Sequence, residues 1–221
     1  MDFIFNASLE KQGQIGNLGV NEYIYASYYI DHMAYFVTYR NTDPVFAVDI
    51  ADAKNPKLCS ELKLPGYSDY LHSFGENQMV GIGYEDEQNK KSKISLFEID
   101  DKKVVSEASK KVLSDEWLSL MVDDHRAVFV DEEKGLLGFY AWDSDKTAFR
   151  YYLFEVKEDS MVSLWETTLK ESRWTENVRG VRIGDIFYAI TDEGRTEACI
   201  LSDVRSTKDA EYNFLYLDRE G

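Results

Sequence analysis

At residues 31–37 the chain reads Asp31-His32-Met33-Ala34-Tyr35-Phe36-Val37, and residues 124–130 repeat this stretch as Asp124-His125-Arg126-Ala127-Val128-Phe129-Val130. The two copies start 93 residues apart, which corresponds to two units of about 46 residues. Weaker relatives of the stretch begin at Glu76 and at Gly184. Each copy predicts a tight turn that leads into the second strand of a repeated unit. A period of about 40–50 residues is typical of the blades of a β-propeller.

A second repeated element follows the first in three of the units, at residues 45–50, 94–99 and 151–156. Each of these short runs ends with an acidic residue between two apolar ones, and a polar turn follows. A further strand-like run comes next, at residues 57–64, 104–112 and 162–169. Four strands in each of several consecutive units is the pattern of a propeller.

The sequence therefore predicts an all-β chain, a β-propeller of about four four-stranded antiparallel blades with an additional N-terminal half-blade. The predicted blades span about 23–65, 68–113, 117–170 and 177–215, and residues 1–20 are predicted to form the outer strands of a further or shared blade. The whole chain, 1–221, would then be a single β-propeller domain or a fragment of one.

The composition is that of a folded chain, and the charge limits the classes of molecule that the chain is expected to bind. Hydrophobic residues make up 44% of the 221 residues, and 15 tyrosines and 12 phenylalanines suit half-buried pleated sheets. The formal net charge is −16, and such a surface repels phosphate backbones, so nucleic acid is not an expected partner. No run of 18 apolar residues is present, so no transmembrane segment is predicted.

Part of the first predicted blade also resembles a known family. The stretch Tyr35-Phe36-Val37-Thr38-Tyr39-Arg40-Asn41-Thr42-Asp43-Pro44, together with residues 49–57 and 62–72, is similar to a family of bacterial and archaeal β-propeller proteins. Its members are often secreted, and their C-terminal propeller is distantly related to WD40 repeats. The chain departs from the family pattern at Ser73, where the pattern has a proline after the histidine. The resemblance implies a propeller fold and an extracellular or cell-surface location, but no particular reaction. Because members of the family are longer, the chain resembles their C-terminal part.

The histidines and cysteines do not predict a metal site. His32 and His125 occupy the same position of the repeat, and equivalent positions two blades apart lie on opposite sides of a propeller axis, too far apart to share one ion. Cys59 and Cys199 lie far apart in sequence without a ligand-like spacing, so free thiols are favoured over a disulfide. No metal and no cofactor is predicted.

Five residues near the expected ends of inner strands are candidates for ligand binding: Arg40, Asp43, Tyr70, His72 and Arg182. A structural role competes in two cases, because Arg40 could pair with Asp43 across a turn, and His72 could be a buried, hydrogen-bonded side chain. The sequence contains no GxSxG nucleophile motif and no glycine-rich phosphate loop before a helix. No catalytic residues are therefore predicted.

These observations favour a non-catalytic interaction or scaffold module of a cell-surface or secreted protein, with a protein or a cell-wall glycan as its partner. One alternative is a hydrolase that acts on glycans or peptides through two carboxylates roughly 5–10 Å apart. A second alternative is a purely structural set of blades that completes a longer propeller. That alternative predicts exposed apolar blade faces and self-association.

Overall fold

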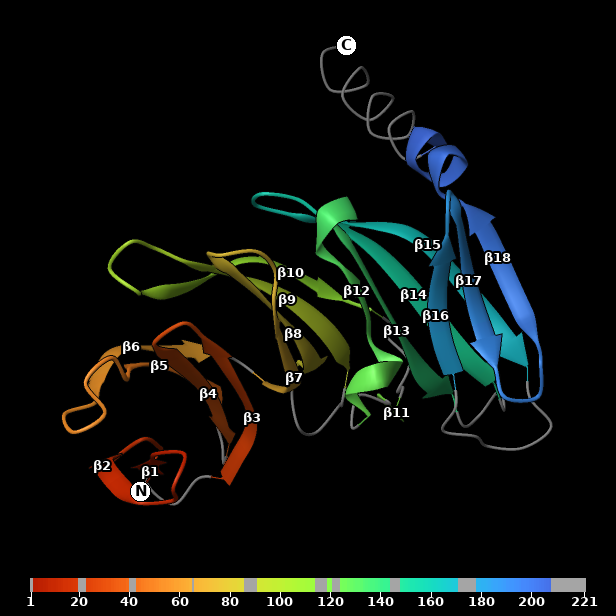
Figure 1. The fold of residues 1–221 in the computed structure, drawn as a ribbon. Coiled ribbons are helices and arrows are strands. Elements are labelled where there is room, and N and C mark those ends of the chain that lie inside the picture. Colours follow the sequence, from red (N-terminus) through yellow and green to blue (C-terminus); the bar gives the residue numbers. More distant parts are fainter. Residues whose placement is uncertain are drawn as a thin grey trace, which may run out of the picture. The chain divides into compact units, whose positions relative to one another are not determined.

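The computed structural model of the chain describes residues 2–19, 23–39, 43–64, 66–85, 91–113, 119–120, 124–143, 148–170 and 178–207. Most of these residues lie in antiparallel strands, which confirms the prediction of an all-β chain (Figure 1). The chain divides into two compact units, residues 1–117 (unit 1) and residues 118–221 (unit 2).

Unit 1 contains two four-stranded sheets and a two-stranded ribbon, and in each the strands follow one another in chain order. The first sheet consists of β3 (Tyr23–Ile30), β4 (Met33–Tyr39), β5 (Asp43–Asp49) and β6 (Lys57–Leu64). The second sheet consists of β7 (Tyr67–Ser73), β8 (Gln78–Tyr84), β9 (Ser92–Ile99) and β10 (Val105–Val112). The ribbon is formed by β1 (Asp2–Phe5) and β2 (Lys11–Ile15).

The first and second sheets pack face to face through side chains that alternate along their strands. Because successive residues of a strand point to opposite faces, every second residue of β4 and β5 reaches the same core as residues of β7, β8 and β9. Its buried members are Met33, Tyr35, Val37, Val45, Ala47, Leu71, Met79, Phe97, Ile99 and Val105. The opposite face of the first sheet carries a smaller cluster that includes Ala34, Phe46 and Val48, and Leu18 packs on it.

Hydrogen bonds join the two stacked sheets at both of their margins. At the first strands, the hydroxyl groups of Tyr28 on β3 and Ser73 on β7 are 2.8 Å apart. At the fourth strands, the Ser60 hydroxyl donates to the carbonyl of Lys103 at 3.2 Å and accepts from the amide of Val105 at 3.3 Å. The first sheet is therefore fixed to the second at both margins of their common core.

Unit 2 contains a third and a fourth sheet. The third sheet has β13 (Leu136–Asp143), β14 (Ala148–Val156) and β15 (Met161–Lys170), and both β11 (Ser119–Leu120) and β12 (Phe129–Asp131) pair with β13. The fourth sheet has β16 (Val178–Ile183), β17 (Ile186–Thr191) and β18 (Thr196–Ile200). A helix at residues 201–207 follows β18.

Aromatic and aliphatic side chains from both sheets of unit 2 form one core around Tyr151, Phe187 and Leu201. Arginines reinforce the packing at its margins. Arg179 on β16 pairs with Asp124 at 2.8 Å, and Arg205 of the helix pairs with Glu155 on β14 at 2.7 Å. The ion pairs therefore connect the fourth sheet to the bend at Asp124, which precedes β12, and the helix to β14 of the third sheet.

The structure corrects the interpretation of the repeat at Asp124. The stretches at Asp31, Glu76 and Gly184 precede β4, β8 and β17, which are second strands as predicted. At Asp124, however, the chain forms a 3-10 helix (His125–Ala127) and then β12, which takes a first-strand position beside β13. Residues 136–143 form β13, which pairs along its whole length with β14 on one edge and with β12 on the other. β13 therefore takes the second position in the sheet, and β12 is left in the first.

The end of the fourth predicted blade also differs from the expectation of strands up to residue 215. Residues 201–207 are helical, and residues 208–215 lie outside the described part of the chain. Leu201 and Val204 are three residues apart and both pack on the core of unit 2, which is the spacing of one helix face. The Arg205–Glu155 ion pair further holds this turn in place.

Candidate functional site

The candidate site is a cluster of four side chains on the first strands of the two sheets of unit 1. Tyr28 comes from β3, and Tyr70, His72 and Ser73 come from β7. The two strands lie side by side (Figure 1). Because Tyr70 and His72 are two residues apart in a strand, their side chains share one face of the sheet. We call these four residues the tyrosine–histidine cluster.

Within this cluster the imidazole of His72 lies near two phenol rings. The hydroxyl of Tyr70 is 3.1 Å from Nδ1 of His72, and the two rings are nearly parallel with centroids 6.0 Å apart. The ring of Tyr28 is tilted against the imidazole at a centroid distance of 5.7 Å. The hydroxyl groups of Tyr28 and Ser73 are hydrogen-bonded to each other. This bond ties β7 of the second sheet to β3 of the first.

The four side chains of the cluster differ in their exposure to solvent. Tyr70 is only 3% exposed, whereas Tyr28, His72 and Ser73 are half-buried. Burial raises the pKa of Tyr70 to about 12, and the neighbouring Tyr28 raises it further in the same direction. The Tyr70 hydroxyl therefore keeps its proton at neutral pH and can donate it to Nδ1 of a neutral imidazole. This bond would orient the His72 ring while part of the ring remains accessible.

The structure brings two of the five predicted site residues together. Tyr70 and His72 form the centre of the cluster. Arg182 lies in unit 2, where its Nε donates to Asp131 at 2.7 Å and its Nη1 donates to the carbonyl of Gly184 at 2.8 Å. Asp43 is the first residue of β5 and pairs with Leu64. Arg40 lies outside the described residues.

Sequence reasoning missed Tyr28 and Ser73. Ser73 carried a signal, because it is the position at which the chain departs from the proline of the family pattern. Proline has no hydroxyl with which to reach Tyr28. Tyr28 carried a weaker signal, since it is one of three tyrosines within residues 25–29. Only the stacking of the first and second sheets shows that Tyr28 faces β7.

The described residues hold no group of three or more histidine, cysteine or acidic side chains placed to bind a metal ion. Cys59 and Cys199 are both free thiols. Burial raises the pKa of Cys199 to about 11. Within the described ranges, no helix has the length and apolar character needed to cross a membrane.

Alkaline pH is expected to destabilise the fold through its buried tyrosines. Tyr70 ionises near pH 10 in the unfolded chain but near pH 12 in the folded one, so stability is intact below pH 10 and falls as pH rises toward 12. Tyr70→Phe should lower stability at pH 7, through the lost hydrogen bond, and should flatten the decline between pH 10 and 12. Urea denaturation at stepped pH measures both effects.

Tyr23→Phe is the matched control for this experiment. Tyr23 is 78% exposed and lies on β3 outside the cluster, so its replacement should leave the alkaline decline as it is in the wild-type protein. A Tyr70→Phe profile parallel to that of the wild type would show that Tyr70 does not contribute to the decline.

Comparison with known proteins identifies relatives along almost the whole chain. The family described as "Beta propeller domain" matches residues 3–199, and this match confirms the predicted β-propeller fold. A protein of Methanocaldococcus jannaschii named "uncharacterized protein" is 33% identical over 189 residues, and one of Archaeoglobus fulgidus with the same name is 31% identical over 191 residues. Each alignment covers 86% of the chain, and the chain spans 28% of the length of either relative.

Solved structures with a similar arrangement of strands are more distant in sequence. The β-propeller domain of the Trilobed protease from Pyrococcus furiosus has a TM-score of 0.44 and 9% identity, over 80% of this chain and 57% of that one. The computationally designed Ika4 protein has a TM-score of 0.45 and 12% identity, over 86% of this chain and 99% of that one.

Proposed function

Because the chain belongs to the family of β-propeller domains, we propose that it is a non-catalytic interaction or scaffold module of a cell-surface or secreted protein. The tyrosine–histidine cluster is the observation that carries this proposal. It joins the first strands of two adjacent sheets and presents half-buried aromatic and hydroxyl groups. In a propeller, strands repeat around a central channel, and side chains of neighbouring sheets can converge there on one ligand.

The chemistry of the cluster favours a glycan or a peptide as the ligand. Phenol and imidazole rings combine an apolar face with a polar edge, so they can stack on a sugar ring or a peptide side chain and bond to its polar groups. The net charge of −16 disfavours polyanions. We therefore propose a protein or a cell-wall glycan as the partner.

The composition of the cluster is also the reason for proposing binding without catalysis. Glycoside hydrolysis requires two carboxylates that flank the scissile bond, and none of the four side chains is a carboxylate. The Tyr70–His72 bond instead fixes the imidazole against a hydroxyl that stays protonated at neutral pH. This arrangement suits a preorganised recognition surface, since ordered side chains lose less entropy on binding.

Binding assays on the full chain test the proposal. Purified cell-wall polysaccharide and an extract of surface proteins serve as the probes, each immobilised separately. His72→Ala and Tyr28→Ala should each weaken binding about tenfold or more, which is the scale of losing one interface anchor. Tyr23→Ala removes an exposed tyrosine of β3, the strand that also carries Tyr28, and should leave binding unchanged. If His72→Ala and Tyr28→Ala bind as the wild type does, the cluster is not the binding site.

The proposed location has a separate test. An exported module should appear in the culture medium or the cell-envelope fraction when the producing cells are fractionated and probed with an antibody to this chain. Recovery in the cytosolic fraction alone would contradict the proposed location without affecting the binding proposal.

A further inference from the structure

The turn between β1 and β2, residues 6–10, carries a sequence pattern that can accept a glycan. Residues 6–8 read Asn6-Ala7-Ser8, and an asparagine followed two positions later by serine or threonine, without a proline between them, is the acceptor pattern of N-linked glycosylation. None of the other asparagines in the sequence is followed two positions later by serine or threonine. Since so short a pattern also arises by chance, the geometry of the turn decides whether Asn6 can serve as an acceptor.

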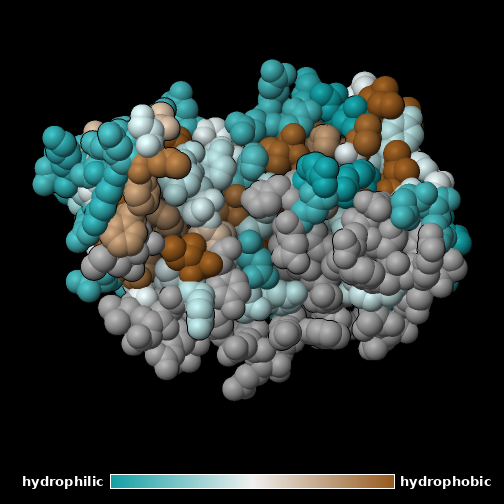
Figure 2. Space-filling view, turned by 60° about the horizontal axis from the view of Figure 1, so that its bottom comes forward, coloured by the Kyte–Doolittle hydropathy of each residue, from teal (hydrophilic) through white to brown (hydrophobic). Residues whose placement is uncertain are grey.

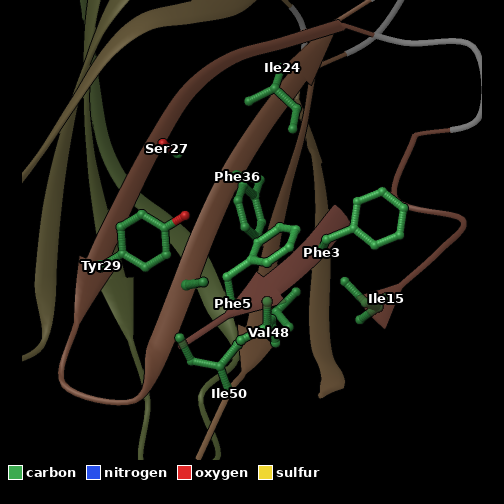
Figure 3. Close-up of a pocket in the computed structure, with 11 residues that line it drawn as sticks. Phe3, Phe5, Ile15, Ile24, Ser27, Tyr29, Phe36, Val48 and Ile50 are labelled. Atoms are coloured by element: carbon green, nitrogen blue, oxygen red, sulfur yellow. The ribbon is translucent and has the colours of Figure 1, made fainter. Parts of the chain in front are cut away.

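The β1–β2 turn is open to solvent within the described part of the chain. Residues 7–10 are exposed, Asn6 is half-buried, and Leu9 has an exposed fraction of 81%. The ribbon contacts the first sheet elsewhere, because Phe3 and Phe5 of β1 line an apolar groove together with side chains of the first sheet (Figure 3). The residues of the turn are not among the side chains that line this groove. The acceptor pattern therefore lies on a part of the ribbon that an enzyme can reach.

The side chain of Asn6 is fixed through its oxygen, and its nitrogen keeps a hydrogen that can be replaced. Oδ1 accepts from the main-chain amides of Ser8 at 3.0 Å and of Glu10 at 2.9 Å. Nδ2 donates to the carboxylate of Glu10 at 2.9 Å. A side-chain amide nitrogen carries two hydrogens, and among the described residues Nδ2 has this one partner. A sugar can therefore replace the second hydrogen while all three hydrogen bonds remain.

A turn-forming role explains Asn6 but not Ser8. The main chain of Asn6 closes the turn, since its amide donates to the carbonyl of Glu10 at 3.0 Å and its carbonyl accepts from the amide of Leu9 at 2.9 Å. Asparagine is also a common turn residue. Ser8 contributes its main-chain amide to the turn, and its exposed hydroxyl has no hydrogen-bond partner among the described residues. The hydroxyl is therefore available to the enzyme that recognises the pattern.

The exposed side chain of Leu9 does not make the turn a protein-docking surface. Apolar side chains reach the surface among hydrophilic ones at separate places (Figure 2), and single exposed apolar residues are common. The neighbours of Leu9 in the turn, Ser8 and Glu10, are polar, so no contiguous apolar patch runs along the turn. Attached glycans are bulky and hydrated, and one on Asn6 would instead screen this part of the ribbon from other molecules.

We propose that Asn6 carries an N-linked glycan when the chain is exported. This inference rests on the proposed location, because glycans of this kind are attached to surface loops of exported chains. The donor is an oligosaccharide linked to a lipid carrier through phosphate. The bond between its anomeric carbon and the phosphate oxygen breaks, and a bond from that carbon to Nδ2 of Asn6 forms. Nδ2 loses one proton, and the lipid phosphate leaves with the bonding electrons.

Export through a glycosylating pathway tests the inference with the full chain. The chain is secreted from a eukaryotic host behind a cleavable leader, and the tryptic peptide that ends at Lys11 is analysed by mass spectrometry. Most wild-type molecules should carry an oligosaccharide on Asn6. Ser8→Ala removes the hydroxyl and should lower the modified fraction at least about tenfold, whereas Ser8→Thr keeps the pattern and should stay within about twofold of the wild type.

Asn55→Gln is the matched control for Asn6→Gln. Like Asn6, Asn55 is exposed to solvent in a turn, and its amide nitrogen donates to a carboxylate, that of Asp52 at 2.8 Å. Asn55 lacks the acceptor pattern, because Pro56 and a lysine follow it. Asn6→Gln should therefore abolish the modification, and Asn55→Gln should leave it as in the wild type. Thermal unfolding of each secreted variant shows whether it is folded.

The outcomes separate this inference from the proposed location. An unmodified Asn6 in the secreted wild type would overturn the inference, and so would a Ser8→Ala chain modified to the same extent as the wild type. An unmodified Asn6 in chain recovered from the medium or the cell envelope of the producing cells would overturn it as well. Recovery from the cytosol alone would contradict the proposed location, and the secretory host distinguishes this case because it exports the chain through the added leader.

Discussion

Gly83→Ala is expected to destabilise unit 1 by about 3 kcal/mol or more. A Cβ at Gly83 on β8 would lie 1.9 Å from the carbonyl oxygen of Tyr67 and 2.6 Å from the Cα of Ser68. Both are main-chain atoms of β7, which bulges between Ser68 and Tyr70 and so lies over Gly83. Since no side-chain rotation can relieve this contact, the β7–β8 pairing itself must open.

Gly75→Ala is the control for this prediction. Gly75 lies in the turn between the same two strands, with a φ of 74° and nothing within 4 Å of an added Cβ. Its replacement should cost about 1 kcal/mol, from the positive φ alone. Urea denaturation gives the two free energies of unfolding, and hydrogen exchange should show lost protection in β7 and β8 for Gly83→Ala. A cost for Gly83→Ala no larger than that for Gly75→Ala would contradict the prediction.

Gly180→Ala is expected to destabilise unit 2 by about 2–4 kcal/mol. A Cβ at Gly180 on β16 would lie 2.0 Å from the hydroxyl oxygen of Tyr151 and 2.7 Å from Cζ of Phe187. Both rings are fully buried in the core between the third and fourth sheets. The Tyr151 ring therefore has no free space to move into, and the two sheets would have to separate.

A double-mutant cycle with Tyr151→Phe measures this contact directly. The Tyr151 hydroxyl has no hydrogen-bond partner among the described residues, so Tyr151→Phe alone should change stability by less than about 1 kcal/mol. In the double variant the loss of the hydroxyl should recover at least about 1 kcal/mol of the cost of Gly180→Ala. Strictly additive effects would show that the clash with Tyr151 is not the source of the destabilisation.

The regular strands of this protein are predictable from local pattern. Residues 57–64, for example, are predicted to form a strand and form β6 with the same bounds, and the predicted strand at 151–156 makes up the last six of the nine residues of β14. Short runs of Val, Ile, Tyr and Phe between turn residues specify this structure locally. The family match over residues 3–199 confirms the propeller fold that their repetition indicated.

Strand position within a sheet could not be predicted in the same way. The stretches at Asp31 and Asp124 share most of their residues, yet the second precedes a three-residue strand, β12, at the margin of its sheet. The difference arises from residues 136–143, which pair with β14 on one side and with β11 and β12 on the other. Such long-range competition between strands is not visible in a single repeat.

The candidate site was predictable to the extent that it lies on one strand. Tyr70 and His72 were chosen as residues near the end of an inner strand, and the structure joins them. Tyr28 was not, because it is 42 positions away from Tyr70 in the sequence and meets it only through the stacking of two sheets. For Arg182 the sequence predicts a ligand-binding side chain, but in the structure its guanidinium group donates hydrogen bonds to Asp131 and to the carbonyl of Gly184.

The two hydrogen-bonded links between the first and second sheets also have a geometric consequence. One link, Tyr28–Ser73, joins the sheets at their first strands, and the other, through Ser60, joins them at their fourth strands. Two points of attachment on opposite margins fix the wedge angle between the sheets. In a radial array that angle is a full turn divided by the number of blades, and propellers are built with about four to eight. This pair of sheets therefore carries its own angular step, and Tyr28, which belongs to the proposed binding cluster, is also one of the residues that hold that step.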